Sequence, residues 1–195
     1  RSALAGGADV DGDARITYLE VAAFVSAANA KVTDPRGKLS IAAIPPASNR
    51  GAALVDWTAS ATQQARLSTT PREDGPLHLE DERGVRVADL HLAAGQPITL
   101  VLLPGRTLTA RGVSWEARVS TVAGETVALD AVERGEPSMA SRGTVADAFD
   151  RGLFAVPFGA SFYEGFAAAN PRGIFPPPPP LAPRGRSWRT PAAWS

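Results

Sequence analysis

The sequence contains no cysteine. This absence excludes disulfide bonds, a cysteine nucleophile and zinc sites built on thiolates. Long hydrophobic runs are also missing, and none approaches the roughly 20 apolar residues that a membrane-spanning helix needs. We therefore expect no membrane span, and we find no pattern typical of a secretion signal.

An excess of charge of either sign is absent as well. The 20 Lys and Arg residues balance the 20 Asp and Glu residues, so the formal net charge is +0. No global charge therefore attracts the chain to nucleic acid, and we expect no such partner. The chain begins at Arg1 rather than Met. We expect it to derive from a longer or processed protein, and we favour a periplasmic or secreted location.

With 195 residues, of which 44% are hydrophobic, the chain has the composition of an ordinary soluble protein with a sizeable core. Apolar residues at helical spacing predict a helix over Ile16–Ala30. A turn at 34–37 and a short strand over Leu39–Ile44 are predicted to follow, and Pro45-Pro46 ends that strand. These elements form a first region, 1–46.

Short apolar runs separated by turn residues dominate the region 52–132. Their regular spacing favours a small antiparallel β sandwich or barrel. The predicted strands are Leu77–Leu79, Val85–Leu90, Ile98–Leu103, Trp115–Val119 and Thr126–Leu129.

Helical patterns return in the region 143–170, where we predict helices over Thr144–Phe154 and Ser161–Ala169. The basic, proline-rich stretch 171–195 is predicted to be a disordered tail. The fold class expected from the whole sequence is therefore α+β: a loop and helix, a β module, and C-terminal helices.

The stretch Asp9–Glu20 matches the twelve-residue calcium loop of the EF-hand. Calcium is a hard cation that takes six to eight oxygen ligands, and this loop places them at fixed positions. Ile16, between the ligands, is expected to point into the core. The candidate ligands are the carboxylates of Asp9, Asp11 and Asp13, the backbone carbonyl of Arg15, Thr17 through a water, and both carboxylate oxygens of Glu20.

A second interpretation of the same residues needs no metal. Thr17 and Glu20 also have the spacing of a capping box, which satisfies free N–H groups at a helix start. The three aspartates would then form a solvated acidic turn. Four acids at these spacings arise by chance in about one window in ten thousand, which favours calcium. The capping role is also compatible with metal binding.

Two features depart from the EF-hand pattern. Ala14 occupies position six, where the turn needs positive φ and glycine is usual; alanine there costs roughly 1–2 kcal/mol. Gly6-Gly7 precede the loop and argue against a regular entering helix. Because the sequence also contains no second loop, we expect a weak or structural site, with a dissociation constant of about 10⁻⁴–10⁻³ M.

The residues around the acidic loop resemble a known family. Arg1–Asp9, Ile16–Tyr18 and Ala22–Val25 are similar to the end of the peptidase domain in bacterial caspase-like proteins, myxobacterial ones especially. Leu79–Asp89 and Leu153–Gly159 resemble the C-terminal extension of those proteins. The resemblance implies a cysteine-peptidase parent whose N-terminal domain, with the catalytic His and Cys, would be the partner of this chain. Since this chain has no Cys, none of its residues carries that activity.

Three hypotheses follow from these patterns. The first is a calcium-binding, non-catalytic C-terminal segment of a caspase-like cysteine peptidase. The second is a secreted, calcium-stabilised binding module unrelated to peptidases. The third is an autonomous hydrolase that uses His78 or His91, although a hydrogen-bonded or exposed strand histidine is the simpler interpretation of both. The sequence names neither a substrate nor a partner for the β module or the tail.

Overall fold

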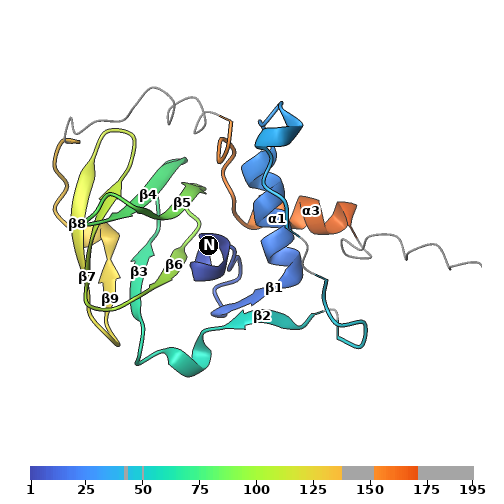
Figure 1. Ribbon diagram of the computed structural model, residues 1–195, viewed down its shortest axis with the longest axis horizontal. Coiled ribbons are helices and arrows are strands. Elements are labelled where there is room, and N and C mark those ends of the chain that lie inside the picture. Colours follow the sequence, from blue (N-terminus) through green and yellow to red (C-terminus); the bar gives the residue numbers. More distant parts are fainter. Residues whose placement is uncertain (42–43, 50, 138–151, 171–195) are drawn as a thin grey trace, which may run out of the picture.

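The computed structural model describes residues 1–41, 44–49, 51–137 and 152–170, and its fold is α+β, as the sequence predicts (Figure 1). A β sandwich lies beside two helices and a small two-stranded ribbon. Among the described helices, none has both the length and the apolar character that crossing a membrane requires.

The N-terminal layer begins with a short π-helix, η1 (Ala3–Gly7), followed by the acidic loop, strand β1 (Arg15–Thr17) and helix α1 (Tyr18–Asn29). No regular α-helix enters the loop, because Gly6 interrupts η1 with φ 107°. A side chain on Gly6 would collide with the backbone carbonyl of Thr99 in the sandwich. This glycine therefore allows the N-terminal layer to approach the sandwich closely.

Strand β2 (Ala53–Asp56) pairs antiparallel with β1 and places Val55 opposite Ile16. The strand predicted over Leu39–Ile44 is wrong for the described residues of that stretch, none of which belongs to a strand. Instead, the Leu39 carbonyl accepts a hydrogen bond from Asn29 Nδ2 at 2.7 Å, and the Leu39 N–H donates one to Asn29 Oδ1 at 2.8 Å. In the part of the chain that the structure describes, no strand pairs with this apolar stretch.

Two sheets form the sandwich. The first is antiparallel between β3 and β6 and parallel between β3 and β9, and the second is antiparallel throughout. In spatial order the strands are β6 (Ile98–Leu102), β3 (Ala65–Thr69) and β9 (Thr126–Ala128) in one sheet, and β5 (Arg86–Leu92), β4 (Gly75–Asp81), β7 (Arg106–Arg111) and β8 (Glu116–Thr121) in the other.

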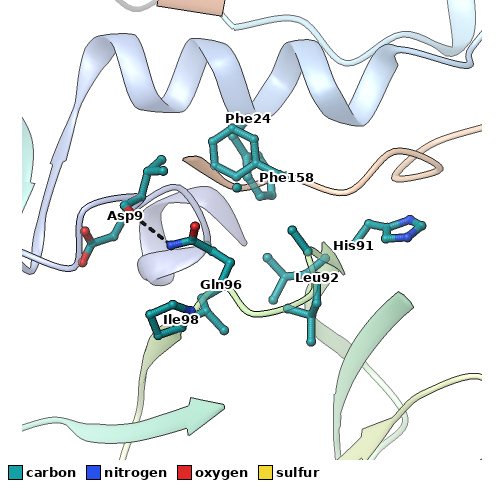
Figure 2. A pocket seen from close by; sticks show the side chains of 13 residues that line it. Asp9, Phe24, His91, Leu92, Gln96, Ile98 and Phe158 are labelled. Atoms are coloured by element: carbon teal, nitrogen blue, oxygen red, sulfur yellow. Dashed lines mark hydrogen bonds between the residues drawn. The ribbon is translucent and has the colours of Figure 1, made fainter. Parts of the chain in front are cut away.

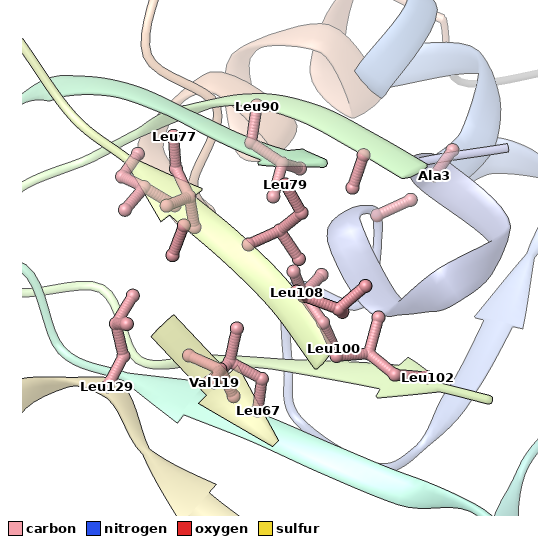
Figure 3. Close-up of a cluster of buried hydrophobic side chains, with 14 of the residues drawn as sticks. Ala3, Leu67, Leu77, Leu79, Leu90, Leu100, Leu102, Leu108, Val119 and Leu129 are labelled. Carbon is pink, nitrogen blue, oxygen red and sulfur yellow. The ribbon is translucent and has the colours of Figure 1, made fainter. Parts of the chain in front are cut away.

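Leucine side chains from both sheets fill the space between them (Figure 3). Leu77, Leu79 and Leu90 come from the four-stranded sheet, and Leu67 and Leu100 from the three-stranded sheet; all are at most 2% exposed. The same buried cluster continues into the N-terminal layer, through residues of η1, β1 and α1. The loop region and the β module therefore share one hydrophobic core.

The short elements η2 (Pro35–Gly37), η3 (Thr58–Ser60) and η4 (Leu129–Ala131) are 3-10 turns. Helix α3 (Ala160–Ala169) confirms the helix predicted over Ser161–Ala169 and packs against α1. The helix predicted over Thr144–Phe154 lies mostly outside the described residues, and its described end, Gly152–Phe154, is a turn. The tail predicted over 171–195 also lies outside them.

Candidate metal site

The acidic loop is shaped by hydrogen bonds from its backbone to its aspartates. Asp9 accepts two, with Oδ1 2.8 Å from the Gly12 nitrogen and Oδ2 3.0 Å from the Ala14 nitrogen. Asp11 accepts one from the Asp13 amide at 3.2 Å, and Asp13 accepts one from the Arg15 amide at 2.7 Å. Each aspartate thus bends the chain back on itself.

These bends bring together the three aspartates that the sequence predicts as ligands. One carboxylate oxygen from each of Asp9, Asp11 and Asp13 lies within 4.8 Å of the other two. Asp11 and Asp13 are exposed and Asp9 is partly buried, so the cluster faces solvent on one side. The arrangement offers carboxylate oxygens only, a donor set suited to a hard divalent cation.

Position six of the loop adopts the conformation that the EF-hand register requires. Ala14 has φ 62°, one of two non-glycine residues with positive φ in the described part of the chain. A side chain in this region is strained by roughly 1–2 kcal/mol. The loop therefore keeps its shape although the sequence supplies alanine.

Glu20 serves as a capping residue in this structure. Its Oε2 accepts hydrogen bonds from the Thr17 nitrogen at 2.7 Å and the Thr17 hydroxyl at 2.8 Å, and the same hydroxyl accepts from the Glu20 nitrogen. Its Oε1 accepts from the Val10 nitrogen at 3.2 Å, which ties the helix start to the loop. The side chain is buried, with Glu20 only 4% exposed, and it is not a member of the three-aspartate cluster.

Five of the six predicted ligands fall into two groups. Asp9, Asp11 and Asp13 converge, whereas Thr17 and Glu20 bond to each other. Arg15, predicted as a ligand through its backbone carbonyl, belongs to neither group, and its side-chain Nε lies 3.1 Å from Asp56 on β2. Both interpretations of the motif are therefore visible together: an acidic cluster and a capping box.

The pKa of Asp9 is raised above its ordinary value. Burial raises the pKa of Asp9 to about 6, and the negative charges of Glu20 and Asp11 add to the increase. Hydrogen bonds from Ala14 and Gly12 oppose this increase without cancelling it. Burial, more than repulsion between carboxylates, therefore sets the direction of this pKa shift.

Residues far away in the sequence hold the loop in place. Gln96 donates from Nε2 to the Val10 carbonyl at 3.1 Å, and its Oε1 accepts from the Ala160 nitrogen at the start of α3 (Figure 2). Trp57 donates its backbone N–H to the Ala14 carbonyl at 2.9 Å and its indole N–H to the Leu4 carbonyl at 3.0 Å. These contacts join residues 43 to 86 positions apart and leave no local signal in the sequence.

Helix α3 also approaches the acidic cluster. Burial raises the pKa of Tyr163, and the charges of Glu20 and Asp11 raise it further, so its phenol lies within their field. A cavity of about 20 Å³ next to the loop, lined by Gln96 and Phe158 among others, has room for about one water molecule.

A second group of charged side chains lies on the outer face of the four-stranded sheet. Cross-strand pairing aligns Glu116, Arg111, His78 and Asp89 in one row across β8, β7, β4 and β5. Arg111 bonds Glu116 at 3.3 Å and also Glu80 at 2.6 Å. We call these four residues, together with Glu80 and Arg86, the sheet row.

Both histidines are hydrogen-bonded, as the simpler interpretation predicts. His78 is 8% exposed and its Nδ1 lies 2.7 Å from Asp89 Oδ1. His91 Nδ1 lies 2.8 Å from the Phe154 carbonyl. Burial tends to raise the pKa of Asp89, but the His78 hydrogen bond and the Arg86 charge outweigh it, so that pKa is lowered.

Comparison with known proteins leaves the family of the chain open. No family model matches the chain, and no curated protein matches it. Among solved structures, the minor pilin GBS52 of Streptococcus agalactiae aligns over 42% of this chain with 10% identity and a TM-score of 0.30. The alignment spans about half of that pilin, 48% of its length. A similarity this distant carries no argument about function.

Proposed function

We propose that the loop Asp9–Glu20 binds a calcium ion and that the chain is a non-catalytic segment stabilised by this ion. The observation that carries the proposal is the convergence of three aspartate oxygens on a loop whose sixth residue has φ 62°. Charge gives smaller support: burial is the main cause of the raised pKa of Asp9, but the negative charges of Glu20 and Asp11 also raise it, and a cation would relieve that repulsion.

The remaining ligands would come from the second half of the loop. Glu20 would leave its hydrogen bonds to Thr17 and Val10 and turn its carboxylate to the ion. The Arg15 carbonyl, and Thr17 through a water, would complete the sphere. Bound calcium would supply charge neutralisation and a fixed start for α1, with no part in bond-making chemistry.

The calcium affinity that we propose is low, because Glu20 must give up hydrogen bonds to bind the ion. Glu20 accepts three hydrogen bonds within the capping box and from Val10, and binding would exchange them for ion contacts. Charge-assisted hydrogen bonds of this kind are each worth roughly 1.5–3 kcal/mol when broken without replacement. A site that must give them up is suited to millimolar calcium, and it serves stability better than signalling.

We further propose that the parent protein is a caspase-like cysteine peptidase, with this chain as its C-terminal portion and the N-terminal peptidase domain as its partner. The family resemblance around the loop supports this, and the absence of cysteine assigns the catalysis to the partner domain. The genomic sequence upstream of Arg1 tests it. A reading frame with a catalytic His and Cys is expected, and its absence would favour a different parent.

A second candidate is a secreted binding module, stabilised by calcium and unrelated to peptidases. The shared hydrophobic core favours it, because η1, β1 and α1 bury residues in the same cluster as the sandwich. The loop, on this hypothesis, belongs to the binding module itself and not to a preceding domain. A folded chain that needs no partner domain and gains stability from calcium would support it.

Calorimetric titration with calcium tests the metal site directly. We expect the wild-type chain to bind one ion and Glu20→Gln to lose most of that binding. Glu82→Gln, an exposed glutamate in the β4–β5 turn, is the matched control and should bind like the wild type. Equal heats for the wild type and Glu20→Gln would remove the metal site from this account.

A further inference from the structure

We draw no further inference here: the strongest candidate, the open groove at one end of the sandwich between the β3–β4 and β7–β8 loops, carries none, because its one aromatic side chain, Trp115, already packs against Gly112 and Arg134 and nothing in the structure shows what would occupy the groove.

Discussion

The acidic loop and the sheet row both crowd carboxylates together, but they stabilise them differently. In the sheet row, the guanidinium of Arg111 lies within ion-pair distance of two glutamates, and Asp89 contacts both His78 and Arg86. In the loop, the aspartates accept hydrogen bonds from backbone amides only, while Arg15 pairs with Asp56 outside the cluster.

The two environments move pKa values in opposite directions. The pKa of Asp89 is lowered, whereas burial and neighbouring negative charge raise the pKa of Asp9 to about 6. The difference shows that burial alone does not decide the outcome, since both side chains are partly buried. The His78 hydrogen bond and the Arg86 charge outweigh burial at Asp89, whereas the two backbone hydrogen bonds that Asp9 accepts do not outweigh burial in the loop.

The largest effect is expected from removing the central charge of the sheet row. Arg111→Met should lower the free energy of unfolding by about 2–3 kcal/mol, because Glu80 loses its shortest ion pair in a poorly hydrated place. Urea unfolding monitored by circular dichroism measures this change. Arg118→Met is the matched control: it is exposed on the same sheet face, and its loss should cost less than about 0.5 kcal/mol.

Neutralising one carboxylate of the loop should change the free energy of unfolding by a smaller amount, and the direction of the change should depend on whether calcium is present. Asp11→Asn keeps an oxygen that can accept from the Asp13 amide but removes one negative charge. Without calcium we expect a slight stabilisation, about 0.3 kcal/mol, from relieved repulsion. With calcium we expect affinity to fall about tenfold, or about 1.4 kcal/mol. Urea unfolding with and without calcium measures both effects, and the same change in stability under the two conditions would contradict a role for the cation.

Relieving the strain at position six should stabilise the loop. Ala14→Gly places the residue best suited to φ 62° in a conformation already present, and we expect about 1 kcal/mol of stability together with tighter calcium binding. Gly12→Ala is the reverse change: its φ is 75° with no atom near an added Cβ, so only conformational strain is introduced. Thermal unfolding of both variants, with and without calcium, measures the two changes in stability: a gain for Ala14→Gly and a loss for Gly12→Ala.

The pH dependence of stability should distinguish the two regions. The folded state binds the Asp9 proton more tightly than the unfolded chain does, so Asp9 contributes stability below pH 3.8 that is lost as the pH rises through about 6. Asp89, whose pKa is lowered, contributes stability above its usual pKa that is lost as the pH falls. In calcium-free buffer, Asp9→Asn should remove the decline between pH 4 and 6. An unchanged profile would contradict the raised pKa.

Local patterns in the sequence predicted the local parts of this structure. The helix expected over Ile16–Ala30 is α1 at Tyr18–Asn29, which starts later because Thr17 is the cap. The aspartates converge as their spacing predicts, since each bonds only to amides of its own loop. Strands with apolar runs, such as Leu77–Leu79 within β4, were also predictable from short-range periodicity.

Elements that depend on neighbours were not predictable in this way. Strands β3 and β7 bury only alternate residues, and their outward residues are polar: Arg66 and Ser68 in β3, and threonine and arginine in β7. No apolar run therefore marks these strands. The stretch Leu39–Ile44 has a strand pattern, but none of its described residues pairs with a strand. The supports of the loop, Gln96 and Trp57, act through hydrogen bonds that only the folded chain brings together.

The β1–β2 ribbon has a consequence for engineering. Residues 15–17 pair with residues 53–56, so the two ends of the segment between them lie side by side. The connector at 44–49 is largely exposed, and doubling the length of such a loop costs only about 0.6 kcal/mol. An epitope or fluorescent reporter grafted there would leave the ion loop and the sandwich joined through their shared hydrophobic core.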